Sequence, residues 1–348
     1  MKNAIIVGAT GFGGLGLIEI LLRHPGINLA QLAARKDASR RINEVFPHLT
    51  GHCDLMIVNP EDIDYSNIDI AFFSTPDRAG MTMIDEFYKR EIPVIDFSGD
   101  FRFPNIDDYK TYARNKGMEE HHHAEWALEK SVYGLPEKNS GCIKSAMIIG
   151  NPGCFAVAMI LGLLPAVEHG LIESDTIVCN GTTGVSGAGK SSGDANLYPQ
   201  RHENVNNYRE ACHQHLVEVE NQLAIFSDSR PKIMFVPQVI PLNRGILVNS
   251  YAAVGENLSQ EEIFSLYTEY YDKHPFVAVT GRSPNTADVR GSNRCLIRPL
   301  LDKRTGTLLV TSVIDNLIKG QAGNAVQNAN LRLGFNETIA IDMVPFYP

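Results

Sequence analysis

The start of the chain constrains the fold most, because a short apolar strand runs directly into a glycine-rich turn and an apolar helix. Residues 4–7 are Ala-Ile-Ile-Val, a β-branched run typical of a buried parallel strand. Gly-Ala-Thr-Gly-Phe-Gly-Gly follows at 8–14, and residues 15–22 have the composition of an apolar helix. Bare backbone at Gly8, Gly11 and Gly14 can approach a pyrophosphate that rests on the helix N-terminus. The order predicts a dinucleotide site opening a βαβ unit, whereas the glycines alone are equally typical of a tight turn.

Strands and helices alternate up to about residue 150, and the pattern then changes. Apolar runs predict strands at 29–34, 54–58, 68–74, 92–96 and 146–149, with a helix at 77–90. Further along, they predict strands at 175–180, 232–239, 246–254 and 307–314, and helices at 154–169, 213–226, 259–272 and 317–332. The sequence therefore predicts an α/β chain with a Rossmann-type, doubly wound parallel sheet domain, followed by an α+β domain with a mixed sheet.

Two cations follow the second predicted strand. NAD-binding chains often carry an acid there for the ribose hydroxyls, whereas this chain has Ala33-Ala34-Arg35-Lys36. Positive charge suits a 2′-phosphate, so the sequence favours NADP, with Arg35 as a phosphate contact. The alternative is that Arg35 and Lys36 are solvated loop charges.

Length, charge and cysteine usage narrow the class of protein. With 348 residues the chain exceeds the usual size of one core, and a net charge of −9 argues against nucleic acid as the main partner. We find no signal peptide and no apolar run of membrane-spanning length. The six cysteines form no CxxC pair, which predicts reduced thiols in a cytoplasmic protein and no zinc ribbon.

Residues 184–191, Gly-Val-Ser-Gly-Ala-Gly-Lys-Ser, match the phosphate-binding pattern GxxxxGK[ST] of P-loop NTPases. That pattern requires a helix after the loop, but residues 192–199 are polar, turn-rich and aperiodic. We therefore expect no NTPase, although exposed amides in such a loop can still bind a phosphoryl group.

Cys154 has the best setting for a nucleophile, because it follows a strand and a Pro-Gly turn and begins an apolar helix. Amides and the helix dipole stabilise a thiolate at such a position. The alternative is a small packed residue at a helix start. His213 and His215 precede a helix that contains Glu218, so either histidine is a candidate acid/base partner, oriented by the carboxylate.

Together these motifs resemble the N-acyl-γ-glutamyl-phosphate reductase family of arginine biosynthesis, which is related to aspartate-semialdehyde dehydrogenase. The resemblance covers nearly the whole chain and is carried by Gly8 to Gly14, Asp96 to Arg102, Tyr133 to Glu137, Asn151 to Phe155, Gly184 to Lys190, Pro241 to Leu247 and Asp315 to Gly320. It implies that residues 1–150 and 315–348 form the NADP-binding domain and 151–314 the catalytic and oligomerisation domain. It also implies a homodimer or homotetramer.

The resemblance further implies roles for individual residues. Cys154 would be the nucleophile and His213 or His215 the acid/base, with His215 favoured because it lies closest to the helix start. Expected cofactor contacts are Gly8, Thr10, Gly11, Phe12, Gly13, Gly14, Arg35, Ser186, Gly187 and Asn316. Expected substrate contacts are Arg102, Arg244, Asn151 and Glu218.

The implied chemistry starts with attack of the Cys154 thiolate on a γ-acyl phosphate. Phosphate leaves, and the resulting thioester is reduced with NADPH to a thiohemiacetal that collapses to the semialdehyde with help from His215. Arg102 and Arg244 suit the substrate phosphate and carboxylate, since guanidinium forks bind such groups, but either could equally form a structural ion pair. We expect no metal site at His121-His122-His123, because consecutive side chains point in different directions.

Three alternatives remain open at this stage. A sister reductase would act on N-succinylglutamyl, aspartyl or aminoadipyl phosphate, and motifs do not separate these substrates. A P-loop NTPase would hydrolyse ATP. A catalytically silent NADP-binding regulator would have an inert Cys154.

Overall fold

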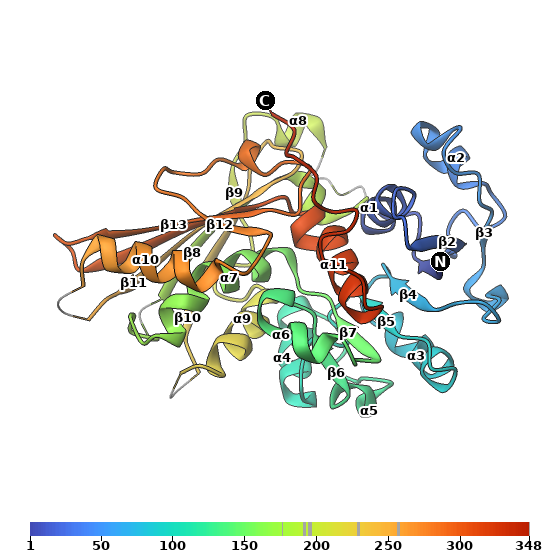
Figure 1. Ribbon diagram of the computed structural model, residues 1–348, viewed down its shortest axis with the longest axis horizontal. Coiled ribbons are helices and arrows are strands. Elements are labelled where there is room, and N and C mark those ends of the chain that lie inside the picture. Colours follow the sequence, from blue (N-terminus) through green and yellow to red (C-terminus); the bar gives the residue numbers. More distant parts are fainter. Residues whose placement is uncertain (176, 191–192, 194–196, 228–229, 256–257, 348) are drawn as a thin grey trace. The chain divides into compact units, whose positions relative to one another are not determined.

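The computed structural model describes residues 1–348 except 176, 191–192, 194–196, 228–229, 256–257 and 348. The chain forms two compact units, and each contains one seven-stranded sheet (Figure 1). Unit 1 comprises residues 1–110, 120–152 and 321–342, and unit 2 comprises 111–119, 153–320 and 343–348.

The sheet of unit 1 has the strand order β3-β2-β1-β4-β5-β7-β6, and its strand pairs are parallel. Its strands are β1 (Lys2–Val7), β2 (Ile27–Ala33), β3 (Ile57–Val58), β4 (Ile70–Phe73), β5 (Val94–Asp96), β6 (Ser131–Tyr133) and β7 (Ile148–Gly150). Every residue of β4, β5 and β7 is buried, as expected for parallel strands that are covered on both faces. The prediction of a doubly wound parallel sheet is confirmed.

The helices of unit 1 are α1 (Phe12–Leu21), α2 (Ile42–Val45), α3 (Gly80–Lys89), α5 (Glu125–Leu128), α6 (Pro136–Ile143) and α11 (Gly323–Arg332). Helix α4 (Ile106–Lys116) runs from unit 1 into unit 2. Although it lies near the C-terminus, α11 packs against α1 and α6. The single helix predicted over 317–332 is wrong in detail, because a π-helical turn, Ile318–Ala322, precedes α11. The Gly320 amide donates to the Asp315 carbonyl at 2.9 Å, five residues back, which is the π spacing.

The sheet of unit 2 has the order β12-β13-β14-β11-β8-β10-β9. Its strands are β8 (Ile177–Thr183), β9 (Asn206–Asn207), β10 (Ile233–Val239), β11 (Ile246–Ala253), β12 (Val277–Val279), β13 (Cys295–Asp302) and β14 (Thr307–Ile314). β8 pairs with β10 and β12 with β13 in parallel, while the other pairs are antiparallel, so the predicted mixed sheet is confirmed. The sequence did not predict β6, β9, β12 or β13.

One face of this second sheet carries the helices α7 (Cys154–Glu168), α9 (His215–Ala224) and α10 (Gln260–Tyr271). A short helix, α8 (Tyr198–Arg201), occurs in the sequence between β8 and β9. From Phe155 to Val167, α7 is buried on all sides, which explains why its sequence is apolar throughout rather than amphipathic.

The opposite face of the same sheet leaves several apolar side chains exposed. Burial alternates along β8, β10 and β11, so every second side chain points away from α7. Those side chains include Val178, Met234 and Tyr251, which are 41%, 47% and 38% exposed. An apolar, exposed sheet face is typical of a surface that another chain covers.

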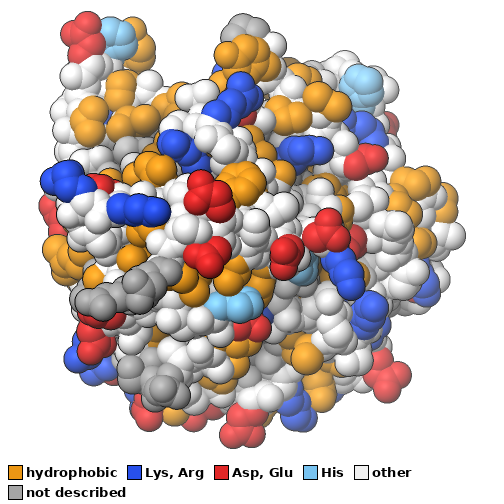
Figure 2. Space-filling model, turned by 60° about the vertical axis from the view of Figure 1, so that its left-hand side comes forward, with side chains coloured by type: hydrophobic (Ala, Val, Ile, Leu, Met, Phe, Trp, Pro, Cys, Tyr) orange, Lys and Arg blue, Asp and Glu red, His pale blue; other side chains and the backbone are white. Residues whose placement is uncertain are grey.

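The surface charge is mixed. On the face drawn in Figure 2, basic and acidic side chains lie intermingled rather than gathered by sign. None of the helices in the described ranges combines the length and the apolar character that crossing a bilayer requires.

Candidate active site

Cys154 is the first residue of α7 and follows the Pro152-Gly153 turn. Gly153 is the N-cap, with an ordinary φ of −70°, and as a glycine it brings no side-chain cap to the first turn. A half-buried thiol at this position faces the positive end of a 15-residue helix, which stabilises its thiolate. By contrast, burial raises the pKa of Cys179 to about 12, so that thiol stays protonated.

The His215 imidazole lies directly against this turn. A Cβ atom on Gly153 would be 2.3 Å from His215 Nε2, so only glycine leaves room for the ring. The buried Glu218 carboxylate accepts the Gly153 amide at Oε2 (3.0 Å), and its Oε1 lies 3.9 Å from His215 Nε2. The first turns of α7 and α9 therefore bring Cys154, His215 and Glu218 together, which are three of the side chains selected from the sequence.

His213 lies beside His215 in an aromatic environment. Its ring is buried among Phe155, Phe235 and Tyr208, at centroid distances of 5.7, 5.3 and 5.6 Å. Burial above all, and then the neighbouring His215, lowers the pKa of His213 to about 2, so this imidazole is neutral at physiological pH. Its Nδ1 accepts the His215 amide at 3.2 Å. His213 is therefore suited to orienting its neighbour rather than to exchanging protons.

Two further residues of unit 2 adjoin the nucleophile, and the sequence did not single them out. Burial, and then the charge of the nearby Cys154, raise the pKa of the Tyr208 phenol. A Cβ atom on Gly320 would be 2.7 Å from the Cys154 Cβ atom, so the π-helical turn passes immediately behind the cysteine. Tyr208 has no sequence signal beyond its place in the loop before α9, but Gly320 ends a segment that carries the family resemblance.

Arg102 is buried and bonded to main-chain oxygens of unit 1. Its Nε donates to the Asn151 carbonyl at 2.8 Å, and its Nη2 donates to the Phe97 carbonyl. The Asn151 side chain accepts Asn324 Nδ2 at 2.8 Å and donates to the Gln321 carbonyl at 3.2 Å. Arg102 thus holds the strand end from which the Cys154 turn departs. The substrate contacts expected of Arg102 and Asn151 stay predictions.

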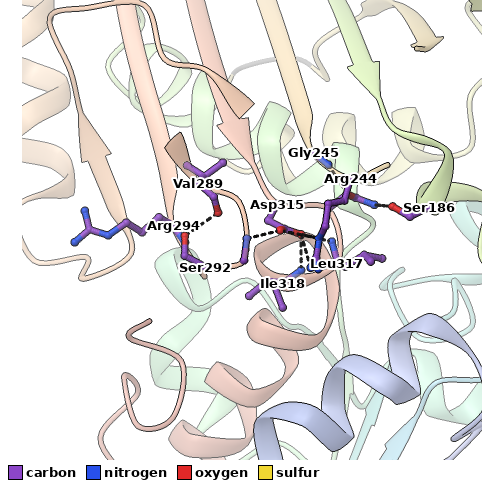
Figure 3. A network of polar contacts seen from close by, with 11 residues as sticks. Ser186, Arg244, Gly245, Val289, Ser292, Arg294, Asp315, Leu317 and Ile318 are labelled. Atoms are coloured by element: carbon purple, nitrogen blue, oxygen red, sulfur yellow. Dashed lines mark hydrogen bonds and ion pairs between the residues drawn. The ribbon is translucent and has the colours of Figure 1, made fainter. Parts of the chain in front are cut away.

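Arg244 forms an ion pair with the buried Asp315, which follows β14 (Figure 3). Its Nε and Nη2 donate to Asp315 Oδ1 at 3.2 and 3.0 Å, while 27% of its side chain remains exposed. The neighbouring Asn316 accepts the Gly245 amide at 2.7 Å and donates to Ser186 Oγ at 3.0 Å. This network joins loops that contain three predicted contacts: Ser186, Arg244 and Asn316.

The loop that matches the P-loop pattern has a different conformation. Val185–Ala188 form a 3-10 turn, and the Gly184, Val185 and Ser186 amides donate to carbonyls of the 242–245 loop. The Gly187 amide donates back to Gly184, so these four amides are used within the protein rather than directed at a phosphate. Ser191 lies outside the described residues. This geometry argues against the NTPase alternative.

The N-terminal glycine turn fits a dinucleotide. Gly8 has φ +88°, and a Cβ atom there would be 2.3 Å from the Ser74 carbonyl oxygen, so glycine is required. A Cβ atom on Gly14 would be 2.6 Å from the Gly8 oxygen, and Gly11 caps α1 without any side-chain hydrogen bond. The bare helix N-terminus, with Thr10, Phe12 and Gly13 in the same turn, is suited to a pyrophosphate.

Arg35 follows β2 and points into solvent. It pairs with Glu61 at 3.1 Å, with side chains 82% and 64% exposed, and such a pair contributes little stability. A 2′-phosphate could therefore recruit this guanidinium at small cost. The residues of unit 1 fit NADP.

In the run His121-His122-His123, the middle histidine has a structural role. His122 is buried, its Nε2 bonds the Asp100 carbonyl oxygen at 2.8 Å, and its Nδ1 accepts the Ala124 amide at 3.1 Å. Across the described ranges, no group of three or more His, Cys, Asp or Glu side chains is arranged to hold a metal ion.

Comparison with known proteins finds matches to two family domains and to full-length relatives. Residues 3–146 match the semialdehyde dehydrogenase NAD binding domain, and residues 154–316 match the semialdehyde dehydrogenase dimerisation domain. The chain is 38% identical over 352 residues to an N-acetyl-gamma-glutamyl-phosphate reductase from Geobacter sp. strain M21, with both chains fully covered. It is 37% identical over 354 residues to one from Thermoanaerobacter pseudethanolicus, again over the full length of both.

Solved structures share the fold at lower identity. Aspartate semialdehyde dehydrogenase II from Vibrio cholerae, complexed with ASA, superposes with a TM-score of 0.70 at 20% identity, covering 96% of this chain and 98% of that one. The Candida albicans aspartate semialdehyde dehydrogenase with NADP gives a TM-score of 0.66 at 17% identity, covering 95% and 98%. At these identities the structures support the two-domain fold.

Proposed function

Because this chain belongs to the N-acetyl-gamma-glutamyl-phosphate reductase family, we propose that it reduces N-acetyl-γ-glutamyl phosphate to N-acetylglutamate 5-semialdehyde and phosphate. The observation that carries the proposal is Cys154 at the N-terminus of α7, with His215 packed against the preceding glycine. Unit 1 would bind NADP and unit 2 would carry the chemistry, in a cytoplasmic step of arginine biosynthesis. The domain division proposed from the sequence, 1–150 with 315–348 against 151–314, assigns the same roles.

The first step is acyl transfer to sulfur. The Cys154 thiolate, favoured by the α7 dipole, attacks the γ-acyl carbon, and the bond to the phosphate oxygen breaks. Phosphate leaves and a thioester remains on Sγ. The main-chain amides in the first turn of α7 are near the reacting sulfur and would stabilise the oxyanion that forms during attack.

The second step is reduction of the thioester. Bound NADPH supplies the hydride. His215 protonates the resulting thiohemiacetal oxygen and takes the proton back as the C–S bond breaks. Glu218 orients His215 and the Gly153 amide, and neutral His213 fixes the His215 backbone. The semialdehyde leaves, and the Cys154 thiolate is regenerated.

We further propose a homodimer that can pair into a tetramer, with the exposed face of the unit 2 sheet as the contact. The matched region 154–316 is a dimerisation domain, and the sheet face away from α7 exposes Val178, Met234 and Tyr251. A second copy of the same face would remove these side chains from water.

The test is the oxidation of N-acetylglutamate semialdehyde in the presence of phosphate or arsenate, followed as NADPH formation. Wild type should be active with NADP and much weaker with NAD, and Cys154→Ala should be inactive. Cys142→Ala, which removes an exposed thiol in unit 1, should keep wild-type activity. Activity that survives in Cys154→Ala would overturn the mechanism. Activity only with N-succinyl, aspartyl or aminoadipyl analogues would change the substrate but keep the reductase.

A further inference from the structure

The geometry points to Asp315 as a positioning residue that presents Arg244 to an oxyanion of the substrate, an inference that rests on the proposed function. Asp315 is fully buried at the end of β14, and its carboxylate is surrounded by donors from three segments of unit 2. Figure 3 shows these donors converging on it. A buried carboxylate that is this densely bonded has a fixed orientation.

The first partner is Arg244, in the loop before β11. Its Nε lies 3.0 Å from Asp315 Oδ2 and 3.2 Å from Oδ1, and its Nη2 lies 3.0 Å from Oδ1. Among the described residues these contacts use Nε and Nη2, which form one edge of the guanidinium, and 27% of the side chain is exposed. A guanidinium that is clamped along one edge has lost most of its rotational freedom before an anion arrives.

The other partners are three main-chain amides from two segments. Asp315 Oδ2 accepts the Gly291 amide at 2.7 Å, and Oδ1 accepts the Leu317 and Ile318 amides at 2.9 and 3.2 Å. The latter two begin the π-helical turn, whose Gly320 passes behind the Cys154 Cβ atom. One carboxylate therefore sets both the Arg244 guanidinium and the turn that backs the nucleophile.

This arrangement separates Arg244 from an ordinary structural ion pair. Part of the Arg244 side chain stays exposed beside a wholly buried carboxylate, so the guanidinium can meet an anion from solution without breaking the pair. Both a phosphate and a carboxylate present the oxyanion that the remaining edge fits. The reverse reaction supplies these two groups on separate molecules, inorganic phosphate and the semialdehyde, so kinetics can tell which of them Arg244 binds.

The experiment measures KM for phosphate and for the semialdehyde separately in wild type, Arg244→Gln, Asp315→Asn and the double variant. Arg244→Gln should raise one of the two KM values by about 10- to 100-fold, the range expected for a lost charge-assisted hydrogen bond, with kcat changed far less. Asp315→Asn should raise the same KM. In the double variant, Asp315→Asn should raise that KM little beyond its value in Arg244→Gln, because the two residues act as a unit. Arg294→Gln, an exposed arginine in the neighbouring loop, is the control and should behave as wild type.

Three results would overturn the inference: Asp315→Asn lowering kcat with both KM values unchanged, additive effects in the double variant, or Arg244→Gln leaving both KM values unchanged. The last test stands even if Asp315→Asn fails to fold, since Arg244→Gln retains the Asp315 contacts to three amides. If wild type turns over none of the substrates, the proposed function is wrong, but the inference about Arg244 is still open to a test by binding. In that case, calorimetric titration of phosphate and of N-acetylglutamate into wild type and Arg244→Gln tests the role of Arg244. Equal binding of both ligands to the two proteins would contradict the inference.

Discussion

At the scale of single residues, burial gives two neighbouring histidines different chemistry. His213 has a pKa of about 2 because its ring is desolvated, so it stays neutral over the whole working range. His215 lies against the Cys154 turn and faces the Glu218 carboxylate. The sequence presents both as candidates, and only the packing of α9 against α7 separates them.

We expect His215→Gln to lower kcat/KM by about 10²- to 10⁴-fold, the usual contribution of a general acid/base. His213→Asn retains an acceptor for the His215 amide and should cost less than about 10-fold. The pH profile of kcat/KM is the deciding measurement, because His213→Asn should leave it unchanged whereas His215→Gln should remove a limb. A shifted pH profile in His213→Asn would show that His213, and not His215, takes part in the proton transfer.

Gly153 provides a second test at this scale. Its φ of −70° is ordinary, so alanine there is excluded by the His215 ring and not by the backbone. Gly153→Ala should displace the imidazole and lower activity by about 10²-fold or more, since misplacement by an ångström has that effect. Its Tm should also fall. The Tm should recover in Gly153→Ala/His215→Ala, where the added methyl group has room.

A matched control for this prediction is Gly141→Ala, because a Cβ atom on Gly141 meets nothing within 4 Å. Its activity should equal that of wild type, and its Tm should be equal or slightly higher, because Gly141 lies in α6 and alanine favours a helix. Full activity in Gly153→Ala would show that His215 does not need its place beside Cys154.

At the scale of elements, two carboxylates lie under the N-terminus of α3. Asp100 accepts the Arg78 amide at 2.8 Å and the Met81 amide at 3.2 Å, and Ser98 Oγ donates to Asp96. A Cβ atom on Gly80 would be 2.8 Å from Asp96 Oδ1, so α3 packs directly on the pair. Burial raises the pKa of Asp100 to about 6. Burial and then the charge of Asp100 raise that of Asp96 well above its ordinary value.

The sign of the pH dependence follows from these shifts. The native state holds protons more tightly than the unfolded chain from about pH 4 to at least 6, so the free energy of unfolding should fall as pH rises through that range. Asp96→Asn mimics the neutral acid. It should raise Tm by a few degrees at pH 8 and flatten the dependence of Tm between pH 5 and 8. Exposed Asp342→Asn is the control and should change neither, whereas a lower Tm for Asp96→Asn at pH 8 would refute a protonated Asp96.

The strand β13 shows why one element escaped prediction. Pro299 interrupts its apolar pattern, and proline argues against a central strand. β12 pairs only with residues 295–297, so from Arg298 onward this side of β13 is an edge, where proline is tolerated. The Gln260 side chain of α10 covers the edge, donating to the Pro299 carbonyl at 3.1 Å and accepting the Leu301 amide at 2.8 Å.

At the scale of the whole molecule, the exposed sheet face of unit 2 should decide the oligomeric state. Val178 and Tyr251 are paired across β8 and β11 and are both exposed. Val178→Lys/Tyr251→Lys places two like charges side by side at the proposed contact. We expect light scattering on a sizing column to show monomers for this variant and dimers or larger for wild type.

Leu22→Lys is the control, since Leu22 is an exposed apolar residue of unit 1 and should leave the oligomer intact. A Val178→Lys/Tyr251→Lys protein of wild-type size would place the contact elsewhere.

The sequence alone predicted the features that depend on residues close together along the chain. The period of apolar residues identified the parallel sheet, most of the mixed sheet, α7 and α9, and the glycine spacing at 8–14 identified the cofactor turn, because these signals depend on neighbours along the chain. Selecting Cys154 needed only its place at a helix start. The resemblance to a known family supplied the expected substrate.

Contacts between distant segments were decided only by the tertiary structure. His215 meets Gly153 across 62 positions of sequence, and Asp315 gathers Arg244, Gly291 and the turn behind Cys154 from three loops. The neutral state of His213 depends on Phe155 and Phe235, which come from a helix and a strand far apart in the chain. A pKa depends on everything that surrounds the group in space, and a one-dimensional pattern does not contain that arrangement.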